Sequence, residues 1–92
     1  MRIEFDPNKN QRNIEERQLS FEEAQFFDWT TAFIEPDLRK PYPEKRFIAS
    51  GYLGERLHIL IFTPITGGFR VISFRKANKR EVAKYETRIT RL

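Results

Sequence analysis

The alternation of apolar and charged residues at the start of the chain predicts a short strand. Ile3 and Phe5 alternate with charged neighbours over residues 2–6, which is the period of a half-buried strand. A helix is expected to begin directly afterwards, because Asp6 is a favourable N-cap residue and Pro7 at the first helical position loses no hydrogen bond.

The following segment predicts a second helix, a short strand and a loop. Ser20 and Glu23 have the spacing of a capping box, so a helix should begin at Ser20. Residues 31–34 indicate a short strand. Two prolines among charged residues then predict a loop over residues 37–45, "DLRKPYPEK".

Three β-rich runs follow from Arg46, separated by the turn signals "LGER" and "PITGG". Turns this short join antiparallel neighbours, so we expect a meander. Because side chains alternate across a strand, the last run should divide its residues between two faces. Ile72 and Phe74 are expected on one face, and Val71, Ser73 and Arg75 on the other.

A terminal amphipathic helix is predicted after Asn78, because Asn78 and Glu81 form another capping-box pattern. At about 100° per residue, an apolar and a basic stripe lie on opposite sides of this helix. The apolar stripe is Val82, Tyr85, Ile89 and Leu92, and the basic stripe is Arg80, Lys84, Arg88 and Arg91. The order of elements predicts an α+β fold.

Composition narrows the possible chemistry. A length of 92 residues predicts one domain covering residues 1–92. With no Cys and one His, the chain has no disulfide framework or thiolate metal site, and we assign no metal ligands and no cofactor. The longest apolar run, residues 59–62, is far too short to span a bilayer, and no signal-peptide pattern is present, so we expect a cytoplasmic protein.

The basic residues are concentrated in the last quarter of the chain. Residues 70–92 contain eight Lys or Arg and two Glu, whereas residues 1–69 contain nine basic and eleven acidic residues. A basic helix face by itself is typical of an ordinary solvated surface. Arg70, Arg75 and Lys76 extend the positive charge onto the preceding strand. A second interpretation is therefore that this basic surface binds the backbone of RNA or DNA.

Other candidate chemistry is sparse. Tyr85 lies on the apolar stripe, where it either packs or transfers a proton near a phosphate. His58 lies in the middle of a strand, where a hydrogen-bonded structural residue and a general base are both open interpretations. No P-loop is present, and the carboxylates Glu22, Glu23 and Glu35 show no catalytic spacing.

Three motifs in order give a stronger indication than periodicity does. They are "FDPNK" over residues 5–9, "SFEEA" over residues 20–24 and "RVISFRKANKREVAKYE" over residues 70–86. With these motifs the chain, from residue 2 to residue 86, resembles the BrnT family of type II toxins. One departure is Glu16-Arg17-Gln18, which stands where the family commonly has Lys-His-Gly. Arginine cannot act as a base there, and Gly at a helix end also serves as a C-cap.

The resemblance implies a RelE-like fold, with two N-terminal helices and a C-terminal helix packed on a curved antiparallel sheet. It also implies a metal-independent endoribonuclease that arrests translation. A BrnA-like ribbon-helix-helix antitoxin would neutralise it in a 2:2 complex and would alone contact operator DNA. The alternative is a non-catalytic module that binds the antitoxin and nucleic acid.

The resemblance also suggests roles for individual side chains, on the expectation that cations of the last strand and last helix converge on one concave patch. Arg70 and Arg75 are the expected phosphate or transition-state contacts. Tyr85 and His58 are the candidates for proton transfer. The expected RNA-binding residues are Lys9, Lys76, Lys79, Arg80 and Lys84.

Overall fold

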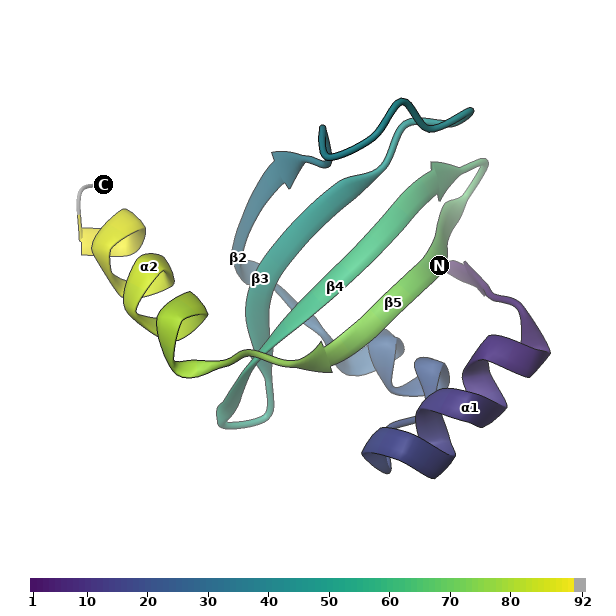
Figure 1. Cartoon of the computed structure of the whole chain (residues 1–92), viewed down its shortest axis with the longest axis horizontal. Coiled ribbons are helices and arrows are strands. Elements are labelled where there is room, and N and C mark those ends of the chain that lie inside the picture. Colours follow the sequence, from purple (N-terminus) through teal and green to yellow (C-terminus); the bar gives the residue numbers. More distant parts are fainter. Residues whose placement is uncertain (91–92) are drawn as a thin grey trace.

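The computed structural model describes residues 1–90 and has an α+β fold built on an open five-stranded sheet (Figure 1). The strands are β1 (Arg2–Glu4), β2 (Asp28–Pro36), β3 (Phe47–Leu53), β4 (Arg56–Ile65) and β5 (Gly68–Lys76), and the helices are α1 (Pro7–Arg17), the 3₁₀ helix η1 (Phe21–Phe26) and α2 (Lys79–Thr90). The order across the sheet is β1-β5-β4-β3-β2. Arg91 and Leu92, which were predicted to extend the two stripes of the last helix, lie outside the described residues.

Strands β2 to β5 form the predicted antiparallel meander, but the sheet as a whole is mixed. β1 pairs in parallel with β5, with Ile3 opposite Phe69, so the prediction of an entirely antiparallel sheet is wrong. No hairpin joins β1 to its neighbour, and only a hairpin would have forced the antiparallel direction. At Gly68 a Cβ atom would lie 1.7 Å from the Arg2 carbonyl oxygen, so this close crossing requires glycine.

The two N-terminal helical segments differ in kind. α1 begins as predicted, since the Asp6 carboxylate accepts a hydrogen bond from the Asn8 amide at 2.8 Å. It ends at Gln18, whose left-handed backbone (φ 53°) lets its amide bond to the Ile14 carbonyl at 2.9 Å. The predicted second helix is a 3₁₀ helix. Its three-residue period places Phe21 and Ala24 on one side, where both are buried.

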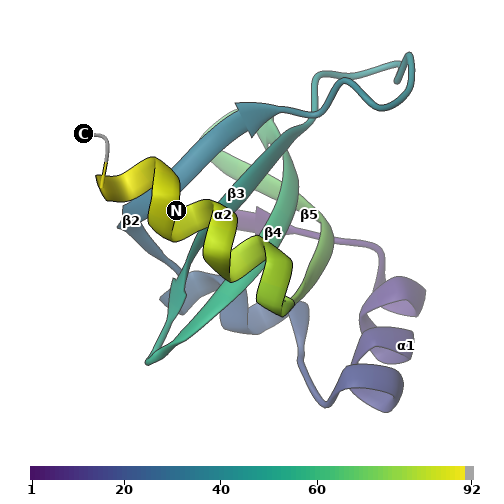
Figure 2. The same cartoon turned by 60° about the vertical axis from the view of Figure 1, so that its left-hand side comes forward.

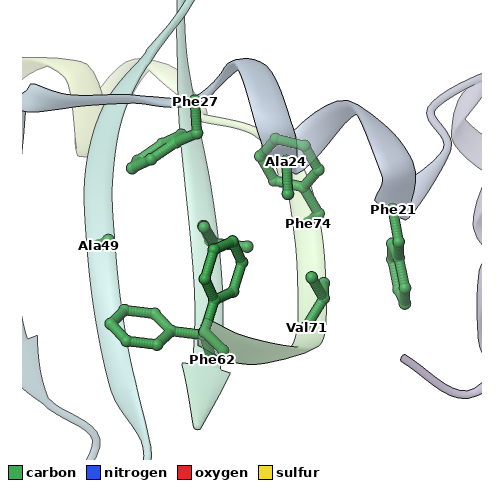
Figure 3. Close-up of a cluster of buried hydrophobic side chains, with 9 residues drawn as sticks. Phe21, Ala24, Phe27, Ala49, Phe62, Val71 and Phe74 are labelled. Carbon is green, nitrogen blue, oxygen red and sulfur yellow. The ribbon is translucent and has the colours of Figure 1, made fainter. Parts of the chain in front are cut away.

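Apolar side chains pack on both faces of the sheet. One core lies between η1 and the strands and contains Phe27, Phe62 and Phe74, with the rings of Phe27 and Phe74 edge-on at 6.3 Å between centroids (Figure 3). The other lies beneath α2 and includes Ile59, Ile61 and Tyr85. Figure 2 shows α2 in front of the sheet and η1 behind it. The face of the sheet beneath α2 is therefore separate from the face that packs against η1. The candidate site lies on the α2 face.

A bulge in β5 changes the predicted alternation of its side chains. The register places Val71 opposite Phe62 and Ser73 opposite Ile61, so Ile72 is an extra residue on this strand. As a result Val71 and Phe74 share the η1-side core, whereas Ile72 packs with the α2-side core. The predicted grouping of Ile72 with Phe74 is wrong. Arg75 still lies on the face opposite Phe74, as predicted, because the bulge ends before it.

α2 begins with the predicted capping box but is rotated from the predicted orientation. The Glu81 amide donates to the Asn78 side chain at 2.8 Å, and the Asn78 amide donates to the Glu81 carboxylate at 2.9 Å. Tyr85 is buried and Arg88 is half-buried against the sheet, whereas Ile89 is exposed. The predicted separation of basic and apolar stripes is therefore wrong at these two positions, because an ion pair turns Arg88 toward β2.

Over residues 1–90, no helix combines the length and the apolar character that crossing a membrane would require.

Candidate active site

A pocket of about 230 Å³ lies between α2 and the sheet, and we refer to it as the site pocket. Cross-strand register builds its floor: Phe33, Ser50, Ile59 and Arg75 form one row across β2, β3, β4 and β5. α2 supplies the opposite wall. The lining residues are Phe33, Glu35, Arg39, Ile48, Ser50, Ile59, Ile61, Arg75, Glu81, Lys84, Tyr85 and Arg88.

Arg75 stands at one side of the site pocket in a bidentate ion pair. Its two terminal nitrogens donate to the two carboxylate oxygens of Glu81 at 2.8 and 2.9 Å. These hydrogen bonds, helped by the Asn78 amide, hold the pKa of Glu81 below its usual value despite partial burial. A planar guanidinium that pairs with a carboxylate in this way is also suited to a phosphate.

A second ion pair stands at the β2 side of the site pocket. Arg88 of α2 donates to the Glu35 carboxylate, and its guanidinium lies over the Phe33 ring at 4.3 Å from the centroid. Sequence patterns alone indicate no catalytic or binding role for Glu35 or Arg88. The available signal was the alternation of β2, since Glu35 lies two residues after Phe33 and thus faces the same side of the sheet.

Tyr85 reaches the sheet from the middle of α2. Its hydroxyl donates to the Thr31 carbonyl at 2.5 Å, and its ring packs edge-on against Tyr52. Burial raises the pKa of Tyr85, and the residue is 7% exposed. The hydroxyl therefore fixes α2 to β2, and its proton already has an acceptor.

The remaining cations of the site pocket are Lys84 and Arg39. Lys84 is exposed on α2 and makes no ion pair within residues 1–90. Arg39 follows β2 and binds the buried carboxylate of Asp37 through two hydrogen bonds of 2.8 Å. Four basic and two acidic side chains thus line the pocket, so its charge favours an anion.

Two of the predicted catalytic residues lie away from the site pocket. His58 is 4% exposed on the η1 side of the sheet, where its ring packs against Phe74 and its Nδ1 lies 2.8 Å from the Arg56 carbonyl oxygen. Burial lowers the pKa of His58. Arg70 lies near the other end of β5, 3.7 Å from the Glu4 carboxylate of β1.

The predicted RNA-binding residues are distributed over several surfaces. Lys76 lines a neighbouring cavity of about 330 Å³ with Arg17 and Arg75. Lys9 lines a cavity of about 190 Å³ beside α1. Lys79 and Arg80 lie exposed in the first turn of α2. Arg75, Lys84 and Tyr85 are thus the predicted residues that meet in the site pocket, and Lys76 adjoins it through Arg75. The expected convergence on one patch is partial.

The structure is a small α+β protein with an open mixed sheet and a pocket under its terminal helix whose charge favours an anion. Its family follows from comparison with known proteins. The family model described as the ribonuclease toxin BrnT of type II toxin–antitoxin systems matches residues 5–81, and the chain belongs to this family. A comparison with curated proteins found no match.

Proposed function

We propose that this BrnT protein is a metal-independent endoribonuclease whose reaction takes place in the site pocket. The observation that carries the proposal is the half-buried guanidinium of Arg75 in a pocket that Lys84 also lines. Membership of a family of ribonuclease toxins supports RNA as the substrate class. A small pocket suits one phosphodiester and its sugar better than a stacked base.

The chemistry expected of such a pocket is transesterification within the RNA. The ribose 2′-oxygen attacks the adjacent phosphorus, and the phosphate passes through a state with additional negative charge. Arg75 lines the pocket and is placed to contact the phosphate. Its guanidinium gives up its hydrogen bonds to Glu81 and donates to the phosphate oxygens instead. Loss of one such contact lowers the rate by about 10² to 10³.

RNA on either side of the cleaved bond has a cationic surface to follow. Arg75 lines both the site pocket and the cavity that contains Lys76 and Arg17. Arg17 in turn lines the cavity that contains Lys9. A strand that leaves the site pocket over Arg75 would therefore pass along the C-terminal end of α1. These contacts neutralise phosphates, so binding should weaken as salt rises.

We further propose that the protein acts in the cytoplasm as one domain of RelE-like type and arrests translation. A BrnA-like ribbon-helix-helix antitoxin in a 2:2 complex would cover the site pocket and provide any contact to operator DNA. A type II toxin requires a protein antitoxin, and an anion-binding pocket under an exposed helix is a surface that acidic side chains of a partner can occupy.

A non-catalytic, antitoxin-binding module is the second candidate function. Arg75 and Arg88 are both already paired with carboxylates of the same chain. Arg17 stands where the family commonly has histidine, and a guanidinium does not accept a proton. These two features favour binding without cleavage.

The two candidates differ in one assay. Purified protein is incubated with RNA in EDTA, with and without the antitoxin, alongside Arg75→Ala and, as a matched control, Arg56→Ala at the exposed start of β4. Cleavage that the antitoxin suppresses, that Arg56→Ala retains and that folded Arg75→Ala loses by about 10² supports the enzyme. Intact RNA at high excess of wild-type protein supports the module. Cleavage by Arg75→Ala at the wild-type rate would contradict the role of Arg75.

A further inference from the structure

We propose that Glu35 is the general base of the site pocket and accepts the proton of the attacking 2′-hydroxyl. This inference rests on the proposed ribonuclease function and identifies the proton acceptor for it. The site pocket contains two carboxylates, Glu35 and Glu81, and their surroundings differ.

Glu81 already uses its hydrogen-bonding capacity within the protein. Both of its carboxylate oxygens accept from Arg75, and one also accepts from the Asn78 amide. Glu35 is different. Its Oε2 accepts from Arg88, but its Oε1 accepts no hydrogen bond from the side chains or amides of residues 1–90. The side chain is 33% exposed, so this oxygen is accessible to a hydroxyl group in the pocket.

The fold places Glu35 across the site pocket from Arg75. Glu35 is on edge strand β2 and Arg75 on β5, with two strands between them, and Glu35 lies two residues along β2 from Phe33, which shares the row of Arg75. Three strand spacings and this offset correspond to a backbone separation of about 16 Å. Both side chains line the same pocket and so extend toward its interior. A phosphate held by Arg75 then has its ribose on the side of Glu35. Attack by the neighbouring 2′-hydroxyl requires a cation at the phosphate and a base at the hydroxyl. Arg75 and Glu35 would fill these two roles.

Arg88 acts as a positioning residue for this carboxylate. Its guanidinium lies over the Phe33 ring and donates to Glu35, which fixes the carboxylate in one orientation. Phe33 and Glu35 follow each other on the same face of β2, so ring, guanidinium and carboxylate form one unit. A base held in this way loses little freedom when the substrate binds.

The step balances without a further reactant. The 2′-hydroxyl proton passes to Glu35, the bond between the 2′-oxygen and phosphorus forms, and the bond between phosphorus and the 5′-oxygen breaks. The 5′-oxygen takes a proton from solvent water, and Glu35 returns its proton to solvent. The products are a 2′,3′-cyclic phosphate and a 5′-hydroxyl end.

The charged groups around Glu35 come from three elements. β5 contributes Arg75, and the segment after β2 contributes Arg39. α2 contributes Glu81, Lys84, Tyr85 and Arg88, while β3 and β4 contribute Ser50 and apolar side chains. Glu35 and Glu81 are the two acids that line the site pocket, so the experiment must separate their contributions.

The test measures single-turnover cleavage of a short RNA in EDTA from about pH 4 to 9 for wild type, Glu35→Gln, Glu35→Asp and Glu81→Gln. Glu55→Gln, at the exposed β3–β4 turn, is the matched control. We expect Glu35→Gln to lose at least about 10² in rate and to lose the acid limb of the pH profile. Glu35→Asp should recover part of the rate, Glu55→Gln should match wild type, and Glu81→Gln should keep the acid limb.

The outcomes distinguish this inference from the function on which it rests. If wild type leaves RNA intact, the ribonuclease proposal fails, and the inference fails with it. If wild type cleaves and Arg75→Ala does not, but Glu35→Gln keeps both the rate and the acid limb, the inference alone is overturned. An RNA with a single 2′-deoxyribose at the cleavage position adds a check, because its cleavage would exclude attack by the 2′-hydroxyl and the role of Glu35 with it.

Discussion

Arg75 and Glu81 form a bidentate ion pair that joins the last strand to the first turn of the last helix. The same carboxylate also caps α2 by accepting from the Asn78 amide. One side chain thus links the pocket guanidinium to the helix start. If a phosphate replaced Glu81 at Arg75, the capping bond would remain, and the exchange would not require α2 to unfold.

Glu81 should contribute to stability in a pH-dependent way. Arg75 lowers the pKa of Glu81 from its ordinary value of 4.5, so its contribution is present above that value and is lost as the pH falls through the lower folded-state pKa. We expect urea unfolding of wild type to lose more stability below about pH 4.5 than that of Glu81→Gln, which retains the capping bond. Glu55→Gln should follow wild type. Parallel losses in Glu81→Gln and wild type would contradict the linkage.

Gln18 should be replaceable by glycine with a gain in stability. Its φ of 53° is the left-handed conformation in which a Cβ atom is unfavourable, and its amide closes α1. We expect Gln18→Gly to raise the free energy of unfolding by about 0.5–1 kcal/mol. The unfolding free energy of Gln18→Asn should lie between those of wild type and Gln18→Gly, and Gln18→Ala should give no gain in stability. Chemical denaturation measures all three, and an equal gain from alanine would exclude the backbone explanation.

The hydroxyl of Tyr85 should matter more to folding than to catalysis. It donates to the Thr31 carbonyl, which Tyr85→Phe would leave without this partner. We expect a loss of about 1–2 kcal/mol in unfolding free energy. The cleavage rate should change less than tenfold at a temperature where the variant is folded. A fall of about 10² in folded protein would instead support proton transfer by Tyr85.

Arg70 and Arg75 should give different kinetic phenotypes. Arg70 is 47% exposed beside Glu4, whereas Arg75 lies in the site pocket. We expect Arg70→Ala to reduce the slope of RNA affinity against salt by about one phosphate contact while the single-turnover rate is retained. Arg75→Ala should lower that rate. Equal losses of rate in the two variants would place Arg70 in the reaction.

Local sequence patterns predicted most of the helices and strands, but they did not predict which distant segments would pair or pack together. The N-cap residues Asp6 and Asn78 predicted two helix starts correctly, and the turn signals predicted the antiparallel meander. The parallel pairing of β1 with β5 has no local signal, because the two strands are far apart in the sequence. Ile72 was placed on the wrong face because one extra residue in β5 interrupts a strict period of two.

The sequence predicted those site residues that are basic and belong to the last strand or the last helix. Arg75 and Lys84 belong to the basic C-terminal quarter, which composition identifies. Glu35 and Arg88 meet because β2 crosses under α2, a tertiary relationship that spacing does not contain. His58 looked like a candidate because histidine often titrates, but its burial depends on which face of β4 meets the core.

The pairing of β1 with β5 has a consequence for biosynthesis. The first strand to leave the ribosome finds its neighbour only after the last strand has been made, and loops closed over such long separations form slowly. Helix α2, the opposite wall of the site pocket, comes later still. The nascent chain therefore lacks a complete site pocket until β5 and α2 have both been synthesised, so no ligand can occupy the pocket before that point.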